Sequence, residues 1–298
     1  MRARHRVLLL VAGTFSLCAL ALSQAGRKPV ASREHTTTLN VTATRADGSD
    51  TPISAKEISL YDDGIEQTIQ SFKPDQSPAR IVLLVDNSKS LRTDVPKLAQ
   101  VAREFIYEIY EGDQLLIVGY DENAEIVTDW TDNPKQVEAS LNMLRKQGEP
   151  HLFDAISAVI DQALRPLSGA SHKRAIVLIG DGLDRGSKTK FMQILAELQT
   201  EDIAVYALEV PDRTGGAFHR DQPKPAQVVQ QLAEATGGRV LSLDDPRAAA
   251  NSICDELRKA RYLLTYSPTS FSSYEARRLL VAGNAGINLR YKATQPPK

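Results

Sequence analysis

The sequence predicts an α/β fold in which a doubly wound, mostly parallel sheet carries helices on both faces and the two flanks form a small antiparallel β module. From about residue 78, short runs of Val, Ile and Leu alternate with amphipathic stretches. Continuous apolar runs of this kind are typical of strands that are covered on both faces, as in parallel sheets. Both flanks instead alternate apolar with polar residues, which is the period of half-exposed strands.

Five apolar runs mark the strands expected in the parallel sheet: residues 81–86, 115–120, 175–181, 203–210 and 239–243. Between and after them, apolar residues spaced i, i+3, i+4 and i+7 predict helices around residues 98–109, 152–163, 191–198 and 228–233, and a last one that contains Cys254. The Gly237-Gly238 pair is a stop signal for the fourth helix. Alternation of strands and helices predicts right-handed crossovers in one sheet.

In the N-terminal flank, alternating apolar residues predict strands around residues 39–43 and 58–60, each followed by an Asp-Gly turn. In the C-terminal flank, three strands are expected at 262–268, 277–283 and 287–293. Because isolated two-stranded pieces are marginal in water, we expect the flanks to pair with each other. The predicted organisation is a β segment at 36–76, an α/β domain at 78–260 and a second β segment at 261–293.

The first 25 residues are typical of an export signal. Three arginines precede an apolar run at 7–22, and Ser23-Gln24-Ala25 places small residues before a cleavage point. The run is shorter than the ~20 residues that a spanning helix needs. We therefore expect cleavage after Ala25 and a secreted, periplasmic or cell-envelope protein without a stable membrane span; retention of the segment as an anchor is the alternative.

Composition and motifs exclude several functional classes. The formal net charge of −1 disfavours a nucleic-acid binder, and two cysteines cannot form a disulfide-rich scaffold or a four-thiolate zinc site. The sequence has no H-E-x-x-H pair, no G-x-S-x-G elbow and no phosphate-binding loop with its lysine. We therefore expect a protein that binds without catalysing a reaction.

Polar residues gather where two of the predicted strands end. Asp86 closes the run at 81–86 and is followed by Ser88 and Ser90, while Asp181 closes the run at 175–181. Ligands of open parallel sheets bind outside the carboxyl ends of the strands. Two carboxylates and two hydroxyls there match the hard oxygen ligands that Mg²⁺ and Mn²⁺ prefer.

At these residues the chain resembles a known family. VDNSKS (85–90) is similar to the D-x-S-x-S signature of the von Willebrand factor A (VWFA) domain, which opens its metal-ion-dependent adhesion site (MIDAS). IGDG (179–182) resembles the later strand of that site, and LAEATGG (232–238) resembles the segment before the last core strand. LYDDGIEQTIQSF (60–72) and YLLTYSP (262–268) are similar to flanks of the bacterial VWFA-related Acidobacterial domain family. The resemblance covers about residues 36–292.

The resemblance implies Ser88 and Ser90 as direct metal ligands, with Asp86 and Asp181 acting mainly through bound water. The family's remaining ligand is a threonine, and Pro150 stands at its position in this sequence. Three outcomes stay open: Glu149 replaces the threonine, water fills the gap, or the metal is lost. His151, Asp121 and His219 are predicted to lie on the partner-binding rim.

These observations predict an exported, non-enzymatic protein that mediates protein–protein or adhesion-type binding, with a partner's Asp or Glu carboxylate bridged by the metal. The alternative is a metal-independent scaffold of a cell-envelope assembly. A remote third interpretation is a Mg²⁺-dependent phosphohydrolase of the haloacid dehalogenase type. That chemistry needs a second acid two residues after the first aspartate, where this chain has Ser88. The long connection at 211–225 leaves the same face and is a further candidate for binding.

Overall fold

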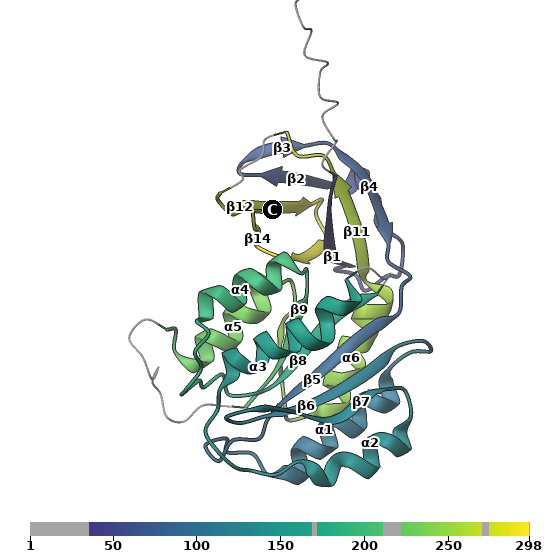
Figure 1. Ribbon diagram of the computed structural model, residues 1–298. Helices are drawn as coiled ribbons and strands as arrows, with labels where there is room; N and C mark the ends of the chain where they lie inside the picture. The colour runs from purple at the N-terminus through teal and green to yellow at the C-terminus, as the bar shows by residue number, and fades with distance from the viewer. Residues whose placement is uncertain (1–35, 169–171, 211–221, 270–273, 298) are drawn as a thin grey trace, which may run out of the picture. The chain divides into compact units, whose positions relative to one another are not determined.

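A six-stranded sheet with the order β10-β9-β8-β5-β6-β7 lies between the helices in the computed structural model (Figure 1). The structure describes residues 36–168, 172–210, 222–269 and 274–297, so the predicted export signal and His219 lie outside the described residues. The strands of this sheet are β5 (Ala79–Asp86), β6 (Gln114–Tyr120), β7 (Ala124–Thr131), β8 (Lys173–Gly180), β9 (Ala204–Glu209) and β10 (Val240–Ser242). All five predicted apolar runs are therefore strands, and they pair in parallel.

Helices cover both faces of this sheet, as predicted. The helices are α1 (Val95–Glu108), α2 (Pro134–Ser140), α3 (Leu152–Val159), α4 (Phe191–Thr200), α5 (Pro225–Ala235) and α6 (Pro246–Lys259). One apolar layer contains side chains of α1, α2 and α6, and the other contains side chains of α3, α4 and α5. Successive side chains of a strand point to opposite faces, so the residues of β5 enter the two layers in turn. Leu83, for example, lies in the first layer and Leu84 in the second. The doubly wound fold class is confirmed.

The edge strand β7 and the helix α2 are the two elements of this domain that the sequence did not predict. β7 pairs antiparallel with β6, and the register between them shifts twice. Within β7, Val127 and Thr128 are the only two consecutive residues that are both buried. The acidic residues Glu125 and Asp129 lie close to them in the sequence. The apolar run is therefore too short for the pattern that marks a strand covered on both faces.

The two flanks pair with each other, as expected, but they form two four-stranded sheets. One sheet has the order β13-β1-β11-β4 and the other has the order β14-β12-β2-β3. Their strands are β1 (Thr37–Arg45), β2 (Ile58–Asp62), β3 (Ile65–Gln67), β4 (Ile69–Pro74), β11 (Arg261–Tyr266), β12 (Arg277–Gly283), β13 (Ile287–Tyr291) and β14 (Thr294–Gln295). Both sheets contribute to one apolar core, in which Phe72 stacks on Tyr262 with ring centroids 4.5 Å apart. We call this part the β module.

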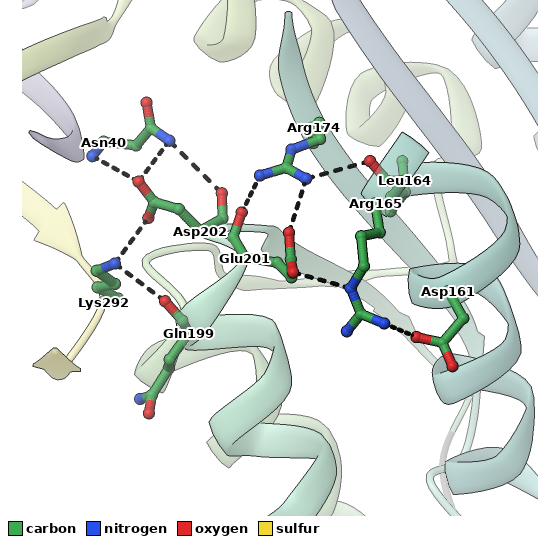
Figure 2. Close-up of polar contacts among 9 residues, drawn as sticks. All are labelled: Asn40, Asp161, Leu164, Arg165, Arg174, Gln199, Glu201, Asp202 and Lys292. Atoms are coloured by element: carbon green, nitrogen blue, oxygen red, sulfur yellow. Dashed lines mark hydrogen bonds and ion pairs between the residues drawn. The ribbon is translucent and has the colours of Figure 1, made fainter. Parts of the chain in front are cut away.

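Polar contacts join the β module to the turn between α4 and β9 (Figure 2). The Asp202 carboxylate accepts hydrogen bonds from the main-chain and side-chain nitrogens of Asn40, at 3.2 and 2.8 Å. The buried Lys292 ammonium donates to the Gln199 carbonyl at 2.9 Å and lies 3.7 Å from Asp202. Because strands β8 and β9 begin next to this turn, the contacts lie at the amino edge of the parallel sheet, opposite the predicted site.

A second set of contacts continues from the same turn (Figure 2). Glu201 lies 2.9 Å from the Arg165 guanidinium and 3.2 Å from that of Arg174.

His35–Lys298 forms one compact unit, so the predicted limits of the α/β domain and the β segments stay predictions. None of the helices in the described residues is long and apolar enough to span a membrane.

Candidate functional site at the carboxyl edge of the sheet

Asp86 is the last residue of β5, and the turn that follows it brings two hydroxyls beside its carboxylate. The main-chain nitrogen of Ser88 donates to Asp86 Oδ1 at 2.8 Å. The hydroxyl oxygens of Ser88 and Ser90 lie 2.9 Å apart and share a hydrogen bond. The main-chain nitrogen of Asn87 donates to the Tyr120 carbonyl at 2.7 Å, which extends the pairing of β5 with β6. The predicted D-x-S-x-S residues therefore form one ordered turn.

Asp181 follows β8, the strand next to β5, and is buried with 5% of its surface exposed. Its Oδ1 accepts a hydrogen bond from the main-chain nitrogen of Leu183 at 2.9 Å. Gly180 allows the two strands' side chains to approach, because a Cβ there would lie 3.2 Å from the Cβ of Asp86 and 3.1 Å from the Tyr120 hydroxyl. The structure thus brings Asp86 and Asp181 together at the carboxyl edge.

The Asp86 carboxyl is held in an unfavourable electrostatic environment. Its side chain is completely buried. Burial and, to a smaller extent, the charge of Asp181 raise the pKa of Asp86 to about 7, against the opposing effect of the hydrogen bonds from Ser88. The Tyr120 hydroxyl is a donor beside this carboxyl and lowers the pKa of Asp86, although no hydrogen bond to Asp86 Oδ2 has regular geometry in the described structure. A buried carboxylate oxygen without a partner is costly unless a cation or donor meets it.

The loop that precedes α3 packs against the turn after β5. The main-chain nitrogen of Gln147 donates to the Asn87 carbonyl at 2.8 Å, and that of Lys89 donates to the Gly148 carbonyl at 3.2 Å. Gly148 has a positive φ of 62°, and a Cβ there would lie 3.1 Å from the Cβ of Asp121. A glycine is therefore required where the loop turns toward the site.

The same loop also contacts the segment after β8. The main-chain nitrogen of Arg185 donates to the Pro150 carbonyl at 2.8 Å. Pro150 is buried, and its side chain offers no oxygen to a metal. The half-exposed Glu149 carboxylate accepts a hydrogen bond from the Arg185 guanidinium at 3.0 Å. Glu149, predicted as the substitute ligand, therefore has an arginine partner at the rim.

The predicted rim residues differ in their surroundings. Asp121 is 9% exposed, and its Oδ1 accepts a hydrogen bond from the main-chain nitrogen of Asn123 at 3.0 Å. This bond stabilises the turn between β6 and β7. His151 directly precedes α3, and its ring lies so close to Gly186 that a Cβ there would be 2.0 Å from Nε2. Both residues therefore lie beside the loops of the site.

Three residues of the site carried no sequence signal for their part in it: Tyr120, Asp184 and Arg185. Tyr120 lies inside an apolar run, so the pattern indicated only a strand. Asp184 is 3% exposed and accepts hydrogen bonds from the Ser187 hydroxyl and from the main-chain nitrogen of Phe153. It thereby ties the segment after β8 to the first turn of α3.

The donor atoms at this edge fit a hard divalent cation. Two carboxylates and two hydroxyls surround the turn after β5, and one buried carboxylate oxygen has no hydrogen-bond partner. Within the described ranges, no group of three or more His, Cys, Asp and Glu residues could hold a metal. Any cation at this edge would therefore depend on the hydroxyls of Ser88 and Ser90 as well as on carboxylates.

Part of the chain matches a known protein family. A family model of the von Willebrand factor type A domain matches residues 81–183, a range that includes Asp86, Ser88, Ser90, Pro150 and Asp181. No curated protein matches the chain.

Three solved structures are similar to parts of the chain. An aerotolerance-related membrane protein from Bacteroides fragilis is 20% identical over 61% of this chain and 99% of that chain, with a TM-score of 0.46. Proximal thread matrix protein 1 from the mussel byssus is 14% identical over 62% of this chain and 49% of that chain, with a TM-score of 0.48. The conserved hypothetical protein BatB from Bacteroides thetaiotaomicron is 18% identical over 61% and 98%, with a TM-score of 0.44.

Proposed function

We propose that the chain, whose residues 81–183 match the family model of the von Willebrand factor type A domain, is an exported, non-enzymatic protein that binds a partner protein at the carboxyl edge of its sheet. The proposed site is a MIDAS-like turn that holds Mg²⁺ or Mn²⁺. Ser88 and Ser90 would offer hydroxyls, and Asp86 and Asp181 would offer carboxylates. The partner would present an Asp or Glu side chain in an adhesion-type contact.

The observation that carries the proposal is the state of Asp86. Its Oδ2 is buried with only the Tyr120 hydroxyl as a neighbouring donor and no regular hydrogen bond, and burial together with the charge of Asp181 disfavours ionisation of the carboxyl. A structural aspartate at a strand end would normally have its oxygens satisfied by main-chain donors. Here one oxygen is satisfied by Ser88, and the other lies beside the Tyr120 hydroxyl and a second carboxylate without a regular hydrogen bond. A bound cation would remove both penalties.

A bound divalent cation supplies positive charge and a coordination position that an incoming carboxylate can occupy. The residues of the chain supply the rest. The hydrogen bond between Ser88 and Ser90 fixes the hydroxyls before binding, which lowers the ordering cost. The contacts of the Gly148 loop and of Arg185 keep three loops in place around the turn. The site is therefore built from preorganised main chain.

A metal-independent scaffold is the second candidate, and one observation favours it. Pro150 removes the hydroxyl that the family places there, and Glu149 is already paired with Arg185. Binding of a partner that survives EDTA and the change of Asp86 would favour this candidate.

Calorimetric titration of EDTA-treated protein with Mg²⁺ and Mn²⁺ tests the proposed site. We expect saturable binding that weakens at least about 10-fold in Asp86→Ala and in Ser88→Ala, because each change removes an oxygen ligand. Asp50→Ala, an exposed aspartate of the β module, is the matched control and should bind as the unaltered chain does. Equal binding in Asp86→Ala and Asp50→Ala would refute the assignment of the site.

Two further measurements test the remaining parts of the proposal. Turnover of p-nitrophenyl phosphate that disappears in Asp86→Ala would contradict a non-enzymatic function and support the phosphohydrolase. Expression of the full chain in a bacterial host, followed by mass determination of its amino terminus, tests export. We expect a chain that begins after Ala25 in the envelope or secreted fraction. An intact terminus in the cytoplasmic fraction would contradict it.

A further inference from the structure

A groove runs between the edge strand β7 and the helix α3, on the face of the sheet that α3, α4 and α5 cover. Its volume is about 660 Å³. Its apolar wall is formed by Leu116, Val118, Ile126, Trp130, Ala155, Ala158 and Val159. Ile126 is 58% exposed and Trp130 is half-buried. Large apolar side chains at a strand edge, beside small alanines on the helix, leave room for side chains of another molecule.

The helix that forms one wall of the groove changes its geometry there. The α-helical turns of α3 end at Val159 and continue as a π-helix from Ile160 to Leu164. Gln162 and Ala163 of this π-helical segment line the groove together with Val159. This π-helical segment ends the helix, because a 3-10 turn at Arg165–Leu167 follows it. Gln162 and Ala163 thereby extend the lining of the groove beyond the last α-helical turn.

The strand that forms the other wall has a free edge. β7 is the last strand of its sheet, and it pairs only with β6 among the strands of the described residues. The main-chain groups on its outer side are therefore available to an added strand. Side chains of such a strand alternate between its two faces, and those on one face would enter the groove.

The charges along this edge indicate the kind of partner. Glu122 and Asp129 line the groove and are exposed. Asp154 also lines it, but its carboxylate accepts hydrogen bonds from the main-chain nitrogens of Lys188 and Thr189 at 3.0 and 2.9 Å. Lys188 is the one lysine or arginine among the lining residues. The exposed carboxylates of Glu122 and Asp129 therefore attract a cationic segment and repel a second copy of the same edge, although Asp129 also accepts a hydrogen bond from the main-chain nitrogen of Trp130 at 2.7 Å.

We propose that the groove between β7 and α3 binds an extended segment of a partner protein that carries both basic and apolar residues on the face turned toward the groove. The segment adds a strand to the free edge of β7. Its apolar side chains pack against Ile126, Trp130 and the alanines of α3, and its basic side chains face Glu122 and Asp129. The contact needs no metal, so it is separate from the site at Asp86.

The test uses as its probe a capped heptapeptide, Lys-Thr-Ile-Thr-Ile-Thr-Lys, in which the lysines and isoleucines lie on one face of an extended strand. Trp130 is the only tryptophan of the chain, so its fluorescence reports on this groove. We expect a saturable fluorescence change with a Kd of about 10–100 μM at low salt. Glu122→Lys combined with Asp129→Lys should weaken binding at least about 10-fold, and rising salt should weaken it too. Glu66→Lys combined with Asp50→Lys is the matched control, since it makes the same charge change at exposed positions of the β module.

Two altered peptides and one treatment separate the alternatives. A peptide with N-methyl groups on alternate amides cannot complete the strand pairing and should not bind. A peptide with glutamate in place of lysine should not bind either. Binding that persists in EDTA and in Asp86→Ala supports a metal-independent groove, whatever the outcome at the proposed metal site.

The proposal is overturned if no binding is seen at about 1 mM peptide. It is also overturned if the edge variant and the control bind equally, if the N-methylated peptide binds as well as the parent, or if EDTA abolishes binding. Sedimentation that shows a dimer of the full chain, lost in Ile126→Glu, would assign the groove to a second copy instead.

Discussion

Replacing Lys292 by methionine tests how the β module is fastened to the amino edge of the sheet. The lysine side chain is 4% exposed and its ammonium donates to the Gln199 carbonyl at 2.9 Å. Its second contact, with Asp202 at 3.7 Å, joins the contacts that Asp202 makes with Asn40 (Figure 2). Methionine preserves the apolar stem of the side chain and removes only the charge and the donors. The change therefore isolates the polar part of the contact.

The structure sets the size of the effect. Loss of a donor to a buried carbonyl costs about 1–3 kcal/mol when no water replaces it. The Asp202 carboxylate keeps both donors of Asn40, so it is not left unpaired. Removing a buried charge also relieves its desolvation, which offsets part of the loss. We expect a net loss of about 1–2 kcal/mol in the free energy of unfolding.

Thermal unfolding monitored by circular dichroism measures this loss. For a unit of this size, about 1–2 kcal/mol lowers the Tm by about 3–6 °C. Lys73→Met, at an exposed position of β4 in the same β module, is the control and should unfold near the temperature of the unaltered chain. If Lys292→Met unfolds within about 1 °C of this control, the polar contact does not stabilise the junction and the reasoning is wrong.

Three further predictions concern other positions. Pro150→Thr restores the hydroxyl that the family places in this loop, so we expect at least about 10-fold tighter Mg²⁺ binding by calorimetry; unchanged affinity would show that the loop is not part of the site. Gly182→Ala should lower the free energy of unfolding in urea by about 2–4 kcal/mol, because Gly182 has a φ of 80° and a Cβ there would lie 2.3 Å from the Pro225 carbonyl oxygen. Burial raises the pKa of the Cys254 thiol well above its ordinary value, so almost no thiolate forms at pH 8. In a Cys18→Ser background, mass spectrometry should find iodoacetamide on Cys254 only after unfolding, and rapid labelling of the native protein would contradict the buried position.

The sequence predicted the core of the fold because the period of its apolar residues matches the elements directly. The run at 81–86 is buried at every position in β5, which is what a strand covered on both faces requires. The pattern failed at β7, where Ala124, Glu125 and Ile126 are all exposed. An edge strand needs no continuous apolar run, since one side of it pairs with no other strand. Its existence depends on β6, which local periodicity does not report.

Only part of the candidate site could likewise be predicted from the sequence. Asp86 and Asp181 could be placed from the sequence, because both follow strands whose carboxyl ends meet at one edge of the sheet. The electrostatic state of Asp86 could not, since it depends on the approach that Gly180 permits and on Tyr120 from another strand. The partner of Glu149 lies 36 residues along the chain at Arg185, and no spacing rule connects them. Contacts between elements distant in sequence are set by tertiary packing, which the sequence pattern alone does not specify.

The amino edge of the parallel sheet contacts the β module, whereas the carboxyl edge carries the candidate cation site, so substitutions at the two edges should have different effects. At the amino edge, Asn40 and Lys292 of the flanks meet the turn before β9, so substitutions there change how firmly the β module is held. At the carboxyl edge, Asp86 and its neighbours contact only loops of the α/β domain in the bonds described here. A change such as Lys292→Met should therefore lower the free energy of unfolding without altering cation affinity. Asp86→Ala should instead weaken cation binding. If Lys292→Met also weakens Mg²⁺ binding at a temperature where the chain is folded, the two edges are coupled through the sheet, and the β module acts on the site instead of only closing the opposite end.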